Sequence, residues 1–405
     1  MTVKNQKSIV FKVIFLLILF FNIHIVYAQE FNITSKNVIL YNMNEEKVLY
    51  QLKDDEKVQI ASLTKIMTTI VAIENEKSLD EKVTITKEML KGIEEYTQVG
   101  FKVGDTPTVK DLLYGSMLPS GADAVNALAI STSGSITKFV ELMNEKAKQL
   151  NLTNTHFDNP VGMDSKDNYS SAKDMAKLLI YSLKNKTFKE VFTAREYKIE
   201  SINKTVKTTL IGYSRSYGLD VSQMTGAKSG FTDGAGLCLA STATIDDVNY
   251  LLITLGANTK SRSNAVKDSL EIYDYYSTSY SYQTILKKDQ KIKTIPIKWG
   301  HEKEYNITST DDLSLYLSND IRKTRIKYTY SGIEEINYKI KKGSKLGTIK
   351  ITYEKEELAS YDVYLNKELK FYHPVLYGII IILVILMIYS LKYIIQARRY
   401  KKNRK

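Results

Sequence analysis

The feature that most limits where this chain can fold is an apolar run close to its C-terminus. Residues 375–391 carry no charged side chain, and at about 1.5 Å per residue a helix of this length nearly spans a bilayer. Lysines and arginines dominate the residues that follow, and such positive flanks stay on the cytoplasmic side of a membrane. We therefore expect a single-pass membrane anchor over 375–395, a basic cytoplasmic tail over 396–405, and the remaining chain outside the cell.

The N-terminus agrees with this orientation. Lysines at positions 4, 7 and 12 precede an apolar run over 13–21, and Ala28 ends a loosely matching small-x-small cleavage site. This order of charge, apolar run and small residue is typical of a secretory signal, here over 1–28. An uncleaved N-terminal anchor is the alternative interpretation.

Two regions of different pattern lie between these terminal segments. Strand-like runs and helical periodicity mix over 29–279, which indicates an α/β (α+β) domain. Polar and apolar residues alternate over 280–370, and turn residues recur, which predicts a small all-β domain. The tyrosines of this second region could contact glycans or simply pack across strands.

Individual elements of the first region can also be predicted. The runs 38–42 and 47–51 form a hairpin, and a short strand occupies 83–86. Thr108 and Ser171 each cap the start of a helix, because a serine or threonine side chain satisfies a free backbone N–H there. Two further strands, 237–243 and 250–255, are joined by a turn at Asp246 and Asp247.

A serine and a lysine three residues apart begin an apolar helical pattern. Ser62 and Lys65 share one helix face, because positions i and i+3 are neighbours on a helix. Burial disfavours the charged form of a lysine, so its pKa falls and it can act as a base. A serine nucleophile needs such a base. This tetrad alone is weak evidence, since the pattern is common by chance.

Two later segments add a hydroxyl and an amine. Ser120 follows a proline on a turn between two predicted helices, where an ordinary N-cap is the alternative interpretation. Lys228, Ser229 and Gly230 lie on a predicted strand. The small Ser229 and Gly230 would let a ligand backbone approach that strand closely.

Composition excludes several kinds of site. The net charge of +12 is spread along the chain and is partly terminal, which favours an anionic envelope over a nucleic-acid partner. One cysteine, Cys238, allows no intrachain disulfide, and four histidines form no metal-binding motif. Cys238 lies between leucines, so we expect a buried thiol. We expect no metal, no other cofactor and no nucleic acid.

Together the three segments resemble the penicillin-recognising serine enzymes, whose motifs are S-x-x-K, S-D-N and K-T-G. The text around each motif is most similar to the low-molecular-weight D-alanyl-D-alanine carboxypeptidase family, the serine-type S11 peptidases. The same order of signal, catalytic domain, small β domain and C-terminal attachment occurs there. The resemblance implies a serine β-lactamase/penicillin-binding-protein-like catalytic domain over 29–279. The stretches that carry it are 61–68, 118–124 and 226–232.

The resemblance also implies roles for residues. Ser62 would attack the carbonyl between two D-alanines of a peptidoglycan stem peptide, and Lys65 would take its proton. Ser120 would relay a proton to the leaving amine. Lys228 would lower the pKa of Lys65 and attract the substrate carboxylate. β-Lactams would acylate Ser62 as covalent inhibitors.

Further binding residues follow from the same resemblance. The Ser229 hydroxyl would bind the substrate carboxylate, with Arg262 as an additional contact. The backbone amides of Ser62 and Phe231 would form the oxyanion hole. The strand that carries Lys228, Ser229, Gly230 and Phe231 would pair with the substrate backbone.

Two positions depart from the family motifs. Ala122 replaces the asparagine that normally ends the second motif, and Ser229 replaces the usual threonine of the third. The second change keeps the hydroxyl. The first removes an amide, and we hypothesise that Asn126, one helical turn later, replaces it. A weakened or inactive wall protein is therefore one alternative, and a β-lactamase is another, although no E-x-x-L-N-like segment lies between the second and third motifs.

Overall fold

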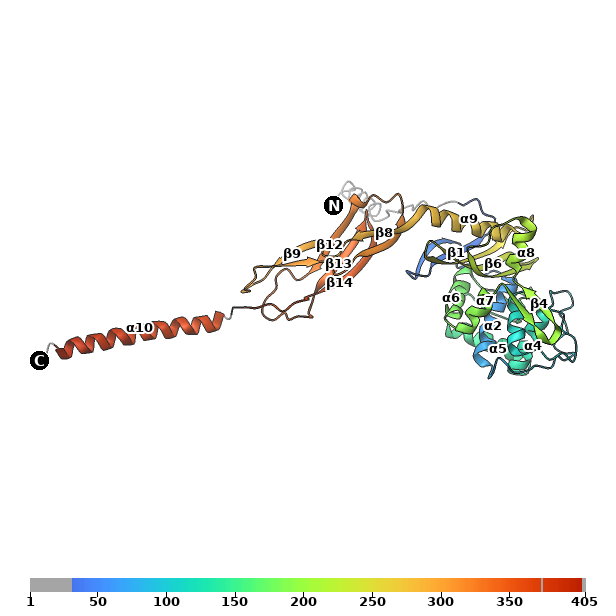
Figure 1. Cartoon of the computed structure of the whole chain (residues 1–405), viewed down its shortest axis with the longest axis horizontal. Helices are drawn as coiled ribbons and strands as arrows, with labels where there is room; N and C mark the ends of the chain where they lie inside the picture. The colour runs from blue at the N-terminus through green and yellow to red at the C-terminus, as the bar shows by residue number, and fades with distance from the viewer. Residues whose placement is uncertain (1–30, 373, 403–405) are drawn as a thin grey trace, which may run out of the picture. The chain divides into compact units, whose positions relative to one another are not determined.

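The computed structural model describes residues 31–372 and 374–402 (Figure 1), so the predicted secretory signal over 1–28 lies outside the described residues. The chain divides between Ser277 and Thr278 into two compact units.

A five-stranded antiparallel sheet forms the centre of the first unit. Its strand order is β2-β1-β7-β6-β5, so β5 lies at one edge. The edge position leaves one side of β5 without a partner strand in this sheet. The strands are β1 (Asn37–Asn42), β2 (Lys47–Leu52), β5 (Met224–Thr232), β6 (Gly236–Ile245) and β7 (Val248–Ala257).

Helices cover both faces of this sheet (Figure 1). Helix α9 (Asn264–Ser279) lies on one face, and most of the other helices gather on the opposite face around α2 (Thr64–Asn75). Helix α2 is buried from Thr64 to Ala72, because neighbouring helices surround its apolar side chains. The surrounding helices are α3 (Val109–Met117), α4 (Ala122–Ser133), α5 (Ile136–Gln149), α6 (Ala172–Leu183) and α7 (Lys186–Thr193).

Most predicted elements of this unit are confirmed. The hairpin is β1–β2, the strand pair is β6–β7, and Cys238 is buried. Thr108 caps α3 in a reciprocal capping box with Asp111, and Ser171 caps α6. The sequence pattern did not predict the hairpin of β3 (Glu196–Ile199) and β4 (Lys204–Lys207), the turn η2 (Glu200–Ile202) between them, or α8 (Thr209–Tyr217).

The predicted strand over 83–86 is wrong. Val83 and Ile85 do point into the core, which explains the alternating pattern. Their backbone N–H groups bond to the carbonyls of Pro107 and Asp105, yet only an isolated bridge forms. Proline has no N–H to donate, so a regular ladder cannot continue past Pro107.

The second unit begins with β strands, as predicted. It contains the pairs β8–β11 and β9–β10 and the three-stranded sheet β12-β13-β14 around one apolar core. Alternation is clearest over 291–299, 313–317, 323–330 and 346–353, which correspond to β9, β11, β12 and β13; the other strands were not predicted. The elements are β8 (Tyr280–Leu286), β9 (Lys291–Pro296), β10 (Glu304–Thr308), β11 (Leu313–Ser318), η3 (Lys323–Arg325), β12 (Ile326–Gly332), β13 (Lys345–Tyr353) and β14 (Glu356–Tyr364).

A long apolar helix, α10 (Pro374–Lys402), follows the β strands. Its stretch Val375–Tyr400 has 26 residues; the most apolar window of 18 residues within it has a mean hydropathy of 2.5, and none of that window is buried against the protein. The helix is therefore long and apolar enough to cross a membrane.

Candidate active site

Ser62 lies in a short 3-10 turn, η1 (Ala61–Leu63), that leads directly into α2. The amine of Lys65, one turn later, donates hydrogen bonds to Ser62 Oγ at 2.8 Å and to the Val161 carbonyl at 2.7 Å. The predicted common face of Ser62 and Lys65 is therefore present. This contact places a potential base within proton-transfer distance of a hydroxyl.

Burial makes Lys65 a better base. Its side chain is only 1% exposed, and the pKa of Lys65 is lowered well below its ordinary value, first by this burial and second by the charge of Lys228. An isolated ammonium group in such surroundings is unfavourable, so a larger fraction of Lys65 is the neutral amine. The 2.8 Å contact is short enough for a neutral amine to accept a hydroxyl proton.

Lys228 joins the second and third motifs. It is 1% exposed on β5, and its amine donates to Ser120 Oγ at 2.9 Å and to the Ser229 carbonyl at 2.8 Å. Burial lowers the pKa of Lys228 to about 7. The three predicted segments thus meet, with two serine–lysine pairs in one place.

Strained backbone holds both serines. Ala61, directly before Ser62, has a φ of +48°, and Ser120 has a φ of +69°. Non-glycine residues in the left-handed region cost on the order of 1–3 kcal/mol, and they persist where the surrounding structure enforces them. Gly162 and Gly230 pack closely against the strained backbone at Ala61 and Ser62. A Cβ on Gly162 would lie 2.0 Å from the Ala61 carbonyl oxygen, and a Cβ on Gly230 would lie 2.9 Å from the Ser62 nitrogen.

The remaining predicted residues line the β5 side of the site. Ser229 Oγ donates to Thr209 Oγ1 at 2.9 Å, so α8 supports this hydroxyl. The exposed Arg262 guanidinium lies 3.8 Å from the centre of the Phe231 ring. This cation–π contact keeps a positive charge beside β5. Thr209 was not predicted, because its helix has little apolar periodicity.

The second acceptor for Lys65 lies in a loop, which the sequence predicts over 151–169 without indicating that it belongs to the site. Asn159 Oδ1 accepts from the backbone N–H groups of Gly162 and Met163, which fixes the loop over 159–163. The loop then directs the Val161 carbonyl at Lys65. Its Asn-Pro-x-Gly composition indicates a fixed turn, but it does not indicate which backbone carbonyl faces the active site.

Ala122 lies in an apolar environment. It is fully buried in a small cluster with Ile93, Val125 and Val161. Asn126 is 7% exposed and makes no hydrogen bond within the described part of the chain. Asn126 therefore makes no hydrogen bond to Lys65, whose second acceptor is the Val161 carbonyl; that Asn126 replaces the missing amide toward the substrate stays a prediction.

Comparison with known proteins assigns the family. The D-alanyl-D-alanine carboxypeptidase family model (peptidase S11) matches residues 24–259, more than half of the chain. The chain belongs to the D-alanyl-D-alanine carboxypeptidase family. The model of the penicillin-binding protein 5 C-terminal domain matches residues 280–370. This carboxypeptidase is accordingly a hydrolase of the serine type, in a family that acts on D-Ala-D-Ala peptides of peptidoglycan and binds β-lactams.

Individual relatives agree with this assignment. The D-alanyl-D-alanine carboxypeptidase DacF of Bacillus subtilis is 30% identical over 83% of this chain and 86% of its own length. DacC of Escherichia coli is 32% identical over 77% of this chain and 78% of its own length. Among solved structures, Streptomyces K15 DD-transpeptidase is 31% identical, with a TM-score of 0.56, and the match covers 61% of this chain and 98% of that structure. Penicillin-binding protein 5 of Haemophilus influenzae (21% identity, TM-score 0.64, 85% and 99% coverage) shows the fold.

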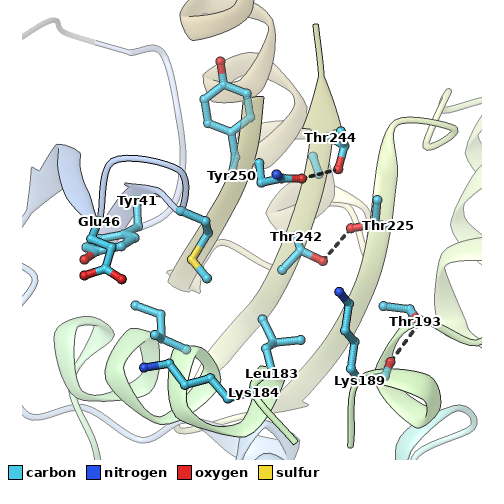
Figure 2. Close-up of a pocket in the computed structure, with 14 residues that line it drawn as sticks. Tyr41, Glu46, Leu183, Lys184, Lys189, Thr193, Thr225, Thr242, Thr244 and Tyr250 are labelled. Atoms are coloured by element: carbon cyan, nitrogen blue, oxygen red, sulfur yellow. Dashed lines mark hydrogen bonds between the residues drawn. The ribbon is translucent and has the colours of Figure 1, made fainter. Parts of the chain in front are cut away.

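A separate pocket of about 470 Å³ lies at the N-terminal end of β5 (Figure 2). Thr225 and Thr242 share a hydrogen bond of 2.7 Å there, near Lys189. None of the predicted site residues lines this pocket, so it is distinct from the site around Ser62.

We expect Gly162→Ala to disrupt the site. Its Cβ would collide with the Ala61 carbonyl, in a backbone with a φ of +89°, so the loop must shift together with the Val161 carbonyl. A displacement of about 1 Å in a catalytic group can lower rates on the order of 10²-fold. The rate of acylation by a fluorescent penicillin measures this effect.

Gly134→Ala is the matched control. Gly134 has a similar φ of +85° but nothing within 4 Å of its Cβ position. This variant should lose about 1 kcal/mol of stability and keep the acylation rate. Equal acylation rates in the two variants would refute the proposed role of the 159–163 loop.

The buried Lys228 should make stability depend on pH. The unfolded chain restores its ordinary pKa of 10.5, while the folded value is about 7. Between these values the unfolded state binds more protons, so Lys228 makes the folded state more stable as pH rises. The midpoint of thermal unfolding of the wild type should therefore rise relative to that of Lys228→Met as the pH increases from 7 to 10. A difference that is constant with pH would show that Lys228 is not shifted.

Proposed function

We propose that Ser62 is the nucleophile and Lys65 the general base of this D-Ala-D-Ala carboxypeptidase. The observation that carries the proposal is the 2.8 Å contact between Ser62 Oγ and a buried Lys65 amine of lowered pKa. Neutral Lys65 takes the hydroxyl proton as Oγ attacks the carbonyl between the two terminal D-alanines.

The acyl-enzyme then forms and is hydrolysed. A bond forms between Ser62 Oγ and the carbonyl carbon, the peptide C–N bond breaks, and the leaving amine takes a proton that passes from Lys65 through Ser120. Ser120 suits this relay because its hydroxyl is held at 2.9 Å by Lys228. Water then attacks the ester carbonyl carbon while Lys65 accepts one of its protons. The bond between that carbon and Ser62 Oγ breaks, Lys65 returns the proton to Ser62 Oγ, and the shortened peptide leaves as a carboxylic acid.

Residues on and beside β5 bind the substrate in this proposal. Lys228, the Ser229 hydroxyl and Arg262 supply positive charge and a donor for the terminal carboxylate. The free edge of β5, beside Gly230, receives the peptide as an added strand. The backbone amides of Ser62 and Phe231 stabilise the oxyanion, an arrangement supported by the close approach of Gly230 to the Ser62 nitrogen.

Mapping of a covalent adduct tests these assignments. A β-lactam should add its full mass to the peptide that contains Ser62 in the purified full-length protein. The adduct should be absent from peptides that contain Ser120 or Ser229. An adduct on either of these two serines would overturn the proposed division of roles.

The proposed arrangement in the cell follows from α10 and the charges around it. We propose a catalytic domain over 29–279 and a β domain over 280–370, both outside the membrane. The anchor occupies 375–395 and the basic tail over 396–405 is cytoplasmic, as the concentration of positive charge there favours. Protease added to intact cells should digest the catalytic domain and spare an epitope fused to the tail; the reverse pattern would refute this topology.

A further inference from the structure

The one tryptophan of the chain occupies an unusual position in the β domain. Trp299 lies in the connection between β9 and β10, and its side chain is 55% exposed. Its φ is +59°, which is unfavourable for a bulky residue. The indole N–H makes no hydrogen bond within the described residues. A large apolar ring is thus held toward solvent by a strained backbone, as expected at a contact surface.

Hydrogen bonds tie this turn to the last residues before α10. The backbone N–H of Tyr372 donates to the Trp299 carbonyl at 2.7 Å, and that of His301 donates to the Lys370 carbonyl at 2.9 Å. Gly300 forms a bridge with Phe371 between these two bonds. The Trp299 turn therefore has a fixed place next to the start of the apolar helix.

Aromatic contacts continue from the turn into the helix. The rings of His301 and Tyr372 stack at 4.3 Å, and the ring of Tyr372 meets that of Tyr377, on the first turn of α10, at 6.0 Å. We call Trp299, His301, Tyr372 and Tyr377 the juxtamembrane aromatic cluster. Tyr372 and Tyr377 are 40% and 49% exposed, so much of the cluster remains available to a partner.

The length of chain between the cluster and the helix limits where the cluster can lie. Tyr372 precedes Val375, the first residue of the apolar stretch, by three residues, which span at most about 10 Å. The headgroup layer on each side of a bilayer is roughly 5–8 Å thick. A spanning α10 therefore brings Tyr372, and with it Trp299, to the level of the headgroups.

We propose that the juxtamembrane aromatic cluster binds the headgroup layer of the outer leaflet, with Trp299 as its main lipid contact. This proposal rests on the proposed membrane span of α10. Tryptophan and tyrosine suit this layer, because their rings are apolar while an N–H or O–H can bond to lipid oxygens. Lys370, exposed beside the cluster, adds positive charge toward lipid phosphates. The β domain is then fixed to the membrane by a second contact besides the helix.

Trp299 reports on its own surroundings, because no other tryptophan contributes fluorescence. The full-length protein is reconstituted in vesicles of phosphatidylcholine and phosphatidylglycerol, with bromine atoms on the acyl chains either near the headgroups or near the bilayer centre. We expect a blue-shifted emission that shallow bromines quench more than deep bromines. Emission that is unshifted, insensitive to brominated lipids and quenched by aqueous iodide would overturn the proposal.

A second single-tryptophan protein separates this proposal from the membrane span itself. In Trp299→Phe/Ile385→Trp, the only indole lies near the middle of the apolar stretch of α10 and should be quenched most by deep bromines. Quenching of this variant without quenching of Trp299 would overturn the surface contact alone. Absence of quenching in both proteins would overturn the span, and the surface contact with it.

Discussion

The Ser62→Ala variant should neither bind a β-lactam covalently nor release D-alanine. Loss of the Oγ nucleophile removes the only group that can form the acyl-enzyme in the proposed mechanism. We expect the rate to fall by roughly 10⁴-fold or more, as when a serine nucleophile is removed from a catalytic unit. Fluorescent-penicillin labelling and D-alanine release measure the two steps separately.

The fold should survive this substitution. Lys65 keeps the Val161 carbonyl as a hydrogen-bond acceptor when Ser62 Oγ is absent, so no donor is left entirely without a partner. Ser182→Ala is a matched control, because among the described residues the Ser182 hydroxyl bonds only to the Leu178 carbonyl within α6. Labelling that persists in Ser62→Ala and disappears in Ser182→Ala would contradict the site assignment.

Lys65→Met should lower acylation by roughly 10²- to 10⁴-fold, the usual contribution of a general base. Methionine is of similar length and suits the buried position, so the variant should fold, although the Val161 carbonyl loses its donor. A small decrease in the midpoint of thermal unfolding is expected from that loss. The acylation rate measured with excess β-lactam reports the chemical step.

Lys65→Arg distinguishes a base from a fixed charge. Arginine keeps the positive charge and the donors but does not deprotonate at accessible pH. If Lys65 acts as a base, Lys65→Arg should be as slow as Lys65→Met. Substantial acylation by a folded Lys65→Arg variant would mean that Lys65 acts only through its charge.

Local spacing was sufficient to predict the Ser62–Lys65 pair, because residues i and i+3 on a helix meet whatever the rest of the chain does. The meeting of Lys228 with Ser120 is different. It depends on β5 being the edge strand next to η1, and no spacing within one segment predicts that contact. The motif resemblance was needed to bring these distant residues together.

Two features of the site escape pattern analysis for physical reasons. The Val161 carbonyl is a backbone group, and the side-chain sequence does not tell which carbonyl of a loop faces inward. The consequence of Ala122 also depends on packing. The sequence suggested a missing amide, whereas the structure surrounds Ala122 with Ile93, Val125 and Val161, where an unpaired amide would be unfavourable.

The packing around Ala122 bears on whether the enzyme is weakened. Lys65 has two acceptors without any contribution from position 122, namely Ser62 Oγ and the Val161 carbonyl. Its pKa is lowered by burial and by Lys228 rather than by that position. The alanine therefore leaves the proposed base in place.

The most direct test of the proposed mechanism is the release of D-alanine from a diacetylated Lys-D-Ala-D-Ala peptide by the full-length protein. The mechanism predicts many D-alanines released per enzyme molecule, together with slow release of bound penicillin. Covalent labelling by penicillin without D-alanine release would contradict the mechanism and support a weakened wall protein. Rapid penicillin turnover without D-alanine release would also contradict it and indicate a β-lactamase.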